Sequence, residues 1–371
     1  MKTVRRLLYR DIVSSVVFVA LAFLSLFFFI DFVDELGAVG SREGYSALNA
    51  AFASLMELPG HLYELAPISV LIGSIFSLAR MAQSSEYTIL RTGGLGPVRA
   101  IALLTVLGLA FAVCTFVAGD YLAPAMEKEA VLLKARFKGG LNLGTAGAWL
   151  KDRKRTAEGE RSYSVNVASA NPDGTLMGIR VFEFDGDGRL VSRIASATGR
   201  VGKDAVWHLD DVTVTHWPVN GVSDQARVEE QHLPRLDWAS GLTAGVVAAA
   251  LLPVNTMSTV DLWRYASHLS QQEQAAQRYA IQFWKKALYP FACLVMIGLA
   301  LPFAYLHARS GGISLKVFGG ILLGISFVLL NNVAGHLGVL HGWTPWLVAA
   351  APSVLYMVMS LAAFAWLVRY R

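Results

Sequence analysis

Long apolar segments that carry no charge constrain this chain more than any other feature. A helix needs roughly 20 apolar residues to cross a hydrocarbon core of about 30 Å, and several runs reach that length. A weaker run at 61–79 has Glu64 and Pro67 near its start. The other runs are 12–30, 100–119, 287–306, 317–335 and 342–368. The pattern predicts six transmembrane helices, three before and three after a polar middle segment.

The composition agrees with a membrane protein. Hydrophobic residues make up 54% of the 371 residues and charged residues only 16%, with a mean hydropathy of +0.47, which is unlike an ordinary soluble domain. The two cysteines, Cys114 and Cys293, fall inside predicted spans. A disulfide framework or a cysteine-rich metal site is therefore excluded.

Positive charge is strongly biased toward one set of flanks. The opposite short loops hold only Arg42, together with acidic residues. Lys and Arg near the ends of spans are retained in the cytoplasm, so both termini and the loops 80–99 and 309–316 are expected there, and the polar middle is expected outside. The biased flanks contain Lys2, Arg5, Arg6, Arg10, Arg80, Arg91, Arg99, Arg309, Lys316, Arg369 and Arg371.

The polar middle reads as a β domain over 121–257. The stretches "RSYSVNVAS", "GIRVFEFDGDGRL" and "AVWHLDDVTVTHW" alternate apolar and polar residues around Gly and Asp turns, which favours a sandwich or jelly roll. The run 242–252 is too short to span and is expected to be the last strand or rim. Ser258 should cap a long helix leading into the fourth span. The predicted domains are 1–120, 121–257 and 258–371.

The cytoplasmic segment 84–94, "SSEYTILRTGG", predicts a helix of about two turns. Ser84 or Ser85 should cap it, Glu86 suits its first turn, and Gly93 and Gly94 should end it in the left-handed conformation. So short a helix is marginal alone in water and needs a surface. It is either a loop resting on lipid headgroups or a coupling helix that docks on an ATPase.

No catalytic motif is present in the sequence. "GGLGP" lacks the full dinucleotide fingerprint, "GRVGKDA" lacks the spacing of a P-loop, and the histidines show no tight metal-ligand spacing. We therefore expect no enzyme activity, no metal and no cofactor bound by this chain. Any work that it performs must draw energy from a partner.

Several motifs together resemble the LptF/LptG family of lipopolysaccharide export permeases. They are "FVDELGAVG", "PISVLIGSIFSLARMAQSSEYTILRTGG", "YLAPAMEKEA", "AVWHLDDV" and "MSTVDLWRYASHLSQQEQAAQRYAIQFWKKALYPF". The resemblance runs from end to end. It implies an α-helical membrane protein with six transmembrane helices (3+3) and a periplasmic β jelly roll inserted between the third and fourth. It places the chain in a Gram-negative inner membrane, with both termini cytoplasmic.

The resemblance also implies a function and a set of partners. Such a permease belongs to an ABC transporter that extracts lipopolysaccharide from the outer leaflet and passes it to a periplasmic bridge. "VDELG" and "QSSEYTIL" favour the LptG branch, which pairs with LptF above an LptB ATPase dimer that binds ATP and Mg, with LptC and periplasmic LptA beyond. No nucleic acid is expected. The alternatives are the paralogous LptF branch, a non-transporting membrane scaffold, or a lipoprotein or macrolide permease with four spans.

Site residues carried over from the family remain implications of the resemblance. Glu86 is the position that meets a basic residue of the ATPase, and the coupling set is Ser84, Ser85, Glu86, Tyr87, Leu90, Arg91 and Gly93. Lys134 and Arg136, with Lys128, would face the lipid phosphates. Some relatives have Lys where this chain has Asp31, so that contact is lost, made elsewhere or bridged by a divalent cation.

An apolar cavity with a lateral gate is expected for the acyl chains. The first and fifth spans would line it with Phe27, Phe28, Phe32, Ile325, Phe327 and Leu329. Asn331 and Asn332 are amides in an otherwise apolar span, and hydrogen bonding between helices explains them without a substrate.

Overall fold

The structure is a computed structural model. It describes residues 2–40, 44–138, 141–142, 147–156, 159–171, 174–202, 204–218, 228–244, 246–247, 256–268, 273–305 and 312–369. The chain divides into two compact units, each described separately below. The first comprises Met1–Asp34, Ser54–Glu127 and Ser258–Arg371, and the second comprises Glu35–Ala53 and Lys128–Met257.

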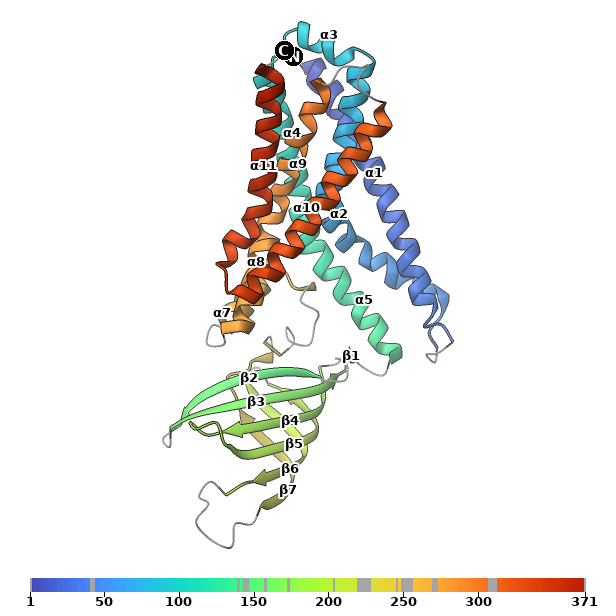
Figure 1. Cartoon of the computed structure of the whole chain (residues 1–371). Helices are drawn as coiled ribbons and strands as arrows, with labels where there is room; N and C mark the ends of the chain where they lie inside the picture. The colour runs from blue at the N-terminus through green and yellow to red at the C-terminus, as the bar shows by residue number, and fades with distance from the viewer. Residues whose placement is uncertain are drawn as a thin grey trace. The chain divides into compact units, whose positions relative to one another are not determined.

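Helices make up the first unit, and several of them continue beyond it. In chain order the helical elements are α1 (Lys2–Leu36), α2 (Ala47–Gln83), α3 (Glu86–Thr92), α4 (Pro97–Val117), a π-helical turn (Ala118–Leu122), α5 (Ala123–Lys138), α7 (Thr259–His268), α8 (Glu273–Leu288), a 3₁₀ turn (Tyr289–Phe291), α9 (Ala292–Tyr305), α10 (Ile313–His341) and α11 (Pro345–Arg369) (Figure 1).

The described residues contain six helical stretches long and apolar enough to cross a membrane, which confirms the predicted number. They are Thr3–Leu36, Ala47–Gln83, Pro97–Phe137, Ala276–Tyr305, Ile313–His341 and Pro345–Trp366. Most extend beyond the apolar runs. The fourth stretch begins at Ala276 instead of 287, because α8 continues into the apolar helix through the 3₁₀ turn. Charged side chains of α8 therefore belong to this stretch.

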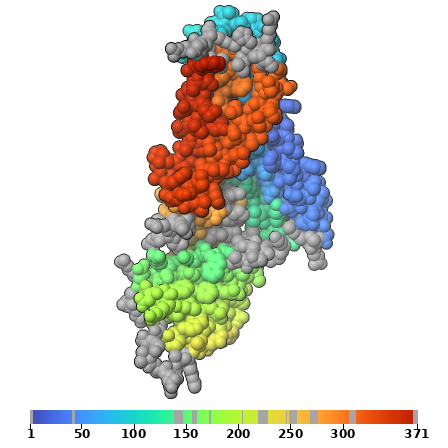
Figure 2. All heavy atoms as spheres, in the orientation of Figure 1, coloured from blue at the N-terminus to red at the C-terminus, as the bar shows by residue number. Residues whose placement is uncertain are grey.

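The helical unit has an apolar core to which all the long helices contribute. On α1, Leu8 and Ile12 are buried at the spacing of one helical turn, and they pack in one cluster with Leu71 and Ile75 of α2. The start of α1, the end of α11 and α3 lie at the same end of this unit (Figure 1). In the space-filling view α10 and α11 run side by side over one face (Figure 2).

The second unit contains one antiparallel sheet. Its strands are β1 (Leu141–Asn142), β2 (Ala148–Thr156), β3 (Gly159–Ala170), β4 (Leu176–Phe184), β5 (Leu190–Val201), β6 (Val206–His216) and β7 (Glu229–Ala239). They pair in the order β1-β3-β4-β5-β6-β7, with β2 also pairing with β3. The sheet is visibly curved (Figure 1). This confirms the predicted inserted β domain with a jelly-roll-like sheet.

The buried face of the sheet follows the predicted alternation with interruptions, one of them in β6. Val165 and Val167 of β3 are fully buried, as are Trp207 and Val212 of β6. The last two residues differ in parity because the chain adopts a positive φ of 54° at Asp211, which turns the following residues back toward the core. An alternation read from sequence alone does not reveal this change.

The predictions for the segments after β6 are partly wrong. The last described strand is β7, which was not predicted, whereas 242–247 contains no strand in its described residues and 248–255 lies outside them. Leu242 is instead part of the buried cluster, and its carbonyl accepts a 3.1 Å hydrogen bond from Trp207 Nε1. The cap at Ser258 is confirmed, because its Oγ accepts a 3.1 Å hydrogen bond from the Asp261 amide at the start of α7.

Candidate functional site

The short helix α3 is anchored by an aromatic side chain. Tyr87 is only 3% exposed, and its ring meets that of Tyr305, at the end of α9, edge-on with centroids 5.4 Å apart. Tyr305 in turn packs on Phe364 of α11 at 5.8 Å. Burial raises the pKa of Tyr87. Tyr87 thus joins this seven-residue helix to α9, and Tyr305 links that contact to α11.

The same face of α3 carries two further contacts. Leu90 packs against the apolar cluster, and the Arg91 guanidinium lies 5.6 Å from the centroid of the Tyr305 ring, a cation–π arrangement. Tyr87, Leu90 and Arg91 are spaced i, i+3 and i+4, so they share one side of the helix. The contacts of these three residues stabilise a helix that would be marginal alone in water.

The C-terminal end of α3 forms the motif that its two glycines suggest. The Leu95 amide donates to the Leu90 carbonyl at 3.0 Å and the Gly94 amide donates to the Arg91 carbonyl at 3.2 Å, which is a Schellman arrangement. Gly94 has the required positive φ of 101°, whereas Gly93 remains at −76°. The prediction that both glycines are left-handed is therefore wrong for Gly93. Pro97 then begins α4, as expected.

The predicted serine cap is wrong. Ser85 occupies the N-cap position with a left-handed φ of 62°, and no side chain caps the helix. The Ser84 hydroxyl instead donates back to the carbonyls of Arg80 at 3.2 Å and Met81 at 3.3 Å. The reason is the tight turn from α2 into α3, which leaves both serines to end the first helix and gives neither hydroxyl to the second.

The opposite side of α3 is exposed. Glu86 and Ile89, three residues apart, both lie on it, and Ile89 is 66% exposed. The sequence analysis omitted Ile89, although its offset from Tyr87 and Leu90 already placed it on the outer side. A helix that is fixed from behind and presents a carboxylate beside an aliphatic side chain is suited to docking on a protein surface.

The candidate phosphate contacts do not form one cationic surface. Lys134 Nζ lies 2.7 Å from Glu35 Oε1 within the second unit, and both side chains are largely buried. Arg136 and Lys128 are exposed. Lys134 and Arg136 are two residues apart on α5, so they point to opposite sides of the helix. Arg136 is exposed, whereas Lys134 already has a carboxylate partner.

Asp31 is engaged by a histidine of the next helix. Its Oδ2 lies 2.8 Å from His61 Nε2, and the Phe27 ring packs on His61 with centroids 4.7 Å apart. Phe28 and Phe32 stack on each other at 6.0 Å. Of the three aromatic residues predicted on α1, Phe27 therefore contacts α2, whereas Phe28 and Phe32 contact each other.

The three residues predicted on α10 do not share a face. Ile325 and Leu329 are four residues apart and exposed, at 48% and 59%. Phe327 is 1% exposed and packs edge-on against Tyr356 of α11 at 5.3 Å. The structure therefore brings Ile325 and Leu329 together on the outside of the helix and leaves Phe327 in the core.

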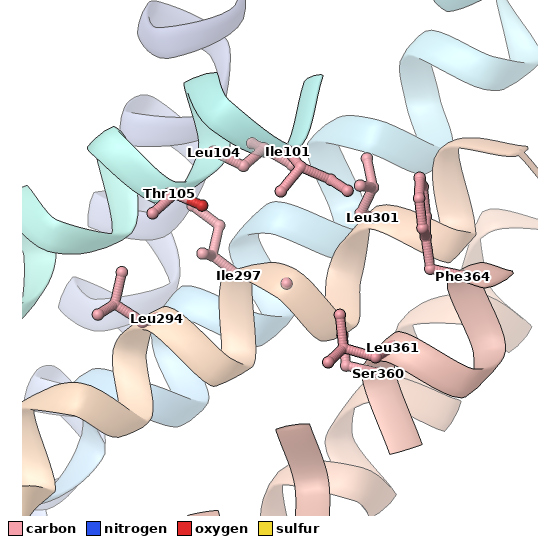
Figure 3. A pocket seen from close by; sticks show the side chains of 10 residues that line it. Ile101, Leu104, Thr105, Leu294, Ile297, Leu301, Ser360, Leu361 and Phe364 are labelled. Atoms are coloured by element: carbon pink, nitrogen blue, oxygen red, sulfur yellow. The ribbon is translucent and has the colours of Figure 1, made fainter. Parts of the chain in front are cut away.

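A small apolar gap lies elsewhere in the helical unit. Side chains from α4, α9 and α11, including Leu104, Ile297 and Phe364, converge around it (Figure 3). Its volume of about 70 Å³ is far below the roughly 300–1,000 Å³ of small-molecule sites. It is a shallow gap between helices, because its lining residues Ile101 and Leu361 are exposed, at 37% and 57%. Among the described residues, no group of His, Cys, Asp and Glu is arranged to hold a metal ion.

These features define an integral membrane protein with six candidate spans, an inserted β-sheet domain, and one short, anchored helix between its second and third spans. Known proteins are similar to this chain over nearly its full length. The family described as "Lipopolysaccharide export system permease LptF/LptG" matches residues 6–368. The chain belongs to this family and is a lipopolysaccharide export permease.

Individual relatives are similar over almost their full length. The lipopolysaccharide export system permease protein LptG of Escherichia coli (strain K12) is 26% identical over 359 residues, which cover 96% of each chain. The protein of the same name from Haemophilus influenzae is 25% identical over 360 residues, again 96% of each chain.

Proposed function

We propose that this chain is the LptG-type subunit of an ABC transporter in a Gram-negative inner membrane, and that it extracts lipopolysaccharide from the outer leaflet. Its partners would be an LptF-type permease, an LptB-type ATPase dimer that supplies ATP hydrolysis, LptC and periplasmic LptA. The similarity to proteins named LptG supports the choice of the LptG branch over the LptF branch. The bias of Lys and Arg toward the flanks on the α3 side supports a cytoplasmic α3.

The observation that carries this proposal is the construction of α3. Tyr87 fixes the helix to α9, and the short turn 93–96 joins it directly to α4. A displacement of the helix therefore moves two spans at once. The exposed Glu86 and Ile89 give the ATPase a charge-assisted contact and an apolar contact. Nucleotide-driven movement of the ATPase would reach the lipid-facing helices by this route.

In this proposal the exposed Arg136 and Lys128 are available to lipid phosphates. The exposed Ile325 and Leu329, with the half-buried Phe28 and Phe32, are available to acyl chains. Lys134 would act by holding Glu35 and the end of α1 in place. A charge reversal at Lys134 would place two carboxylates together, so Arg136→Glu is the cleaner test of headgroup binding.

Reconstitution tests the proposal directly. Liposomes carrying this chain, an LptF-type permease, the ATPase and LptC should release lipopolysaccharide to soluble LptA when ATP is added, and Arg136→Glu should slow the release several-fold. Lys151→Glu, on an exposed face of β2, is a matched control that should leave the rate unchanged. Release without ATP, or equal rates for both variants, would contradict the proposal. Reporter fusions at 95 and 188 would separately check that α3 is cytoplasmic and the sheet periplasmic.

A further inference from the structure

A polar pocket lies between α8 and α10, with a volume of about 430 Å³. Arg278, Gln282 and Lys285 line it from α8, at spacings i, i+4 and i+7, and Asn332, Gly335 and His336 line it from α10, at i, i+3 and i+4. Each set therefore occupies one side of its helix. The volume lies within the range of roughly 300–1,000 Å³ found for small-molecule sites.

The chemistry of the pocket suits an anion. An arginine, a lysine, a histidine and two amides contribute hydrogen-bond donors, and no Asp or Glu is among the described residues that line it. Within the part of the chain that the structure describes, neither the Arg278 nor the Lys285 side chain forms an ion pair or hydrogen bond. Among the same described residues, Asn332 also lacks the hydrogen bond to another helix that was expected of it.

Lys285 is drawn close to α10. A Cβ atom at Gly335 would lie 2.9 Å from the Lys285 ammonium nitrogen, so the absence of a side chain there makes room for the charge. Lys285 is half-buried and belongs to the candidate span Ala276–Tyr305. Charged groups within spans are costly unless a partner of opposite charge is supplied. A negatively charged ligand in the pocket would supply such a partner.

The position of the pocket identifies the kind of ligand. Its lining residues on α10 belong to the C-terminal part of that helix, and this end of α10 is remote from α3 (Figure 1). Trp343 and Trp346 follow and are 50% and 52% exposed. Exposed tryptophans at the ends of spans mark the level of the lipid headgroups. Leu329 and Leu340 of α10 are exposed near it, at 59% and 65%, which suits acyl chains beside a charged headgroup.

We propose that this pocket binds the phosphate of a lipid headgroup, with Arg278 and Lys285 as the cationic donors and Asn332 and His336 as further polar contacts. Two sources share this chemistry, a resident anionic glycerophospholipid and the phosphorylated lipid that the family exports. The proposal does not rest on the ATPase coupling proposed for α3, because it concerns equilibrium binding alone.

Binding to the full-length chain in its permease complex tests the assignment. Phosphatidylglycerol, lipopolysaccharide, inorganic phosphate and diacylglycerol would each be titrated and followed by native mass spectrometry. The double variant Arg278→Gln with Lys285→Gln should weaken binding of a phosphorylated lipid by about 25-fold, because each cation near the headgroup layer contributes about fivefold. Lys285→Arg should retain most of the affinity, and Arg264→Gln, an exposed arginine of α7 outside the pocket, should stay within about twofold.

The outcomes separate the two sources. A loss confined to phosphatidylglycerol would assign the pocket to a resident lipid, and a loss confined to lipopolysaccharide would assign it to the exported one. Equal affinity of the parent protein and the double variant for both lipids would overturn the proposal. So would tight binding of diacylglycerol, or a loss seen for inorganic phosphate alone. If the double variant does not fold, Arg278→Gln at the exposed arginine should still show the fivefold effect.

Discussion

Replacing Tyr87 by Ala should release α3 from the helices on which it packs. Tyr87 is buried and makes the ring contact with Tyr305, and removal of a buried aromatic side chain typically costs about 3–5 kcal/mol. The remaining helix has seven residues and is marginal without that anchor. The cost should therefore appear as local opening of α3, because the six long helices keep their own contacts.

Hydrogen exchange measures this opening. A loss of about 3 kcal/mol corresponds to roughly 100-fold faster exchange for the amides that α3 protects, and peptides covering 86–95 should show it while peptides from α9 do not. Ile89→Ala is the matched control, because Ile89 is 66% exposed and its loss should leave the exchange almost unchanged. Equal exchange in the parent protein and Tyr87→Ala would refute the anchoring role.

Other expectations concern the β domain and its exit. Burial alone would raise the pKa of Glu183, but hydrogen bonds from Ser192, Arg161 and Tyr163 outweigh it and lower the pKa below 4.5. The stability that this carboxylate contributes is therefore present above pH 4.5 and is lost as the pH falls through the lowered pKa. Glu183→Gln should therefore flatten the fall in melting temperature below about pH 4.5, and parallel curves would contradict this. Trp207→Phe should destabilise the sheet by about 1–3 kcal/mol, seen in its melting, because the Leu242 carbonyl loses its donor. Ser258→Ala should cost about 1 kcal/mol and speed exchange at the start of α7; unchanged exchange would refute the cap.

The spans could be predicted because uncharged runs of sufficient length have few other stable environments. Their ends could not, because a helix can continue past its apolar part into residues with charged side chains. Lys285 illustrates this, since the apolar run starts after it although the helix does not. The pocket on α8 was missed for that reason, even though Arg278, Gln282 and Lys285 follow a clear helical spacing.

The sequence predicted the C-terminal end of α3 better than its N-terminal cap. Glycines allow few alternatives to a Schellman ending, whereas a serine hydroxyl can serve the helix before it as readily as the helix after it. The helical period could also have predicted the arrangement on α10. Ile325 and Leu329 are four residues apart and share one side of the helix, whereas Phe327, two residues from each, lies on the other side. The pair between Lys134 and Glu35 joins segments far apart in the chain, and no local pattern reveals it.

Site-specific crosslinking from α3 tests the proposed coupling most directly. A photoreactive residue at position 89, on the exposed side of α3, should capture the P-loop ATPase in inner membranes that contain the assembled complex. A probe at position 98 is the control, because Val98 is 80% exposed but lies on the next helix, α4. We expect strong ATPase capture at 89 that Glu86→Lys reduces, and much weaker capture at 98. Capture of lipid alone at 89, with no ATPase adduct, would show that α3 rests on headgroups and would contradict the coupling role.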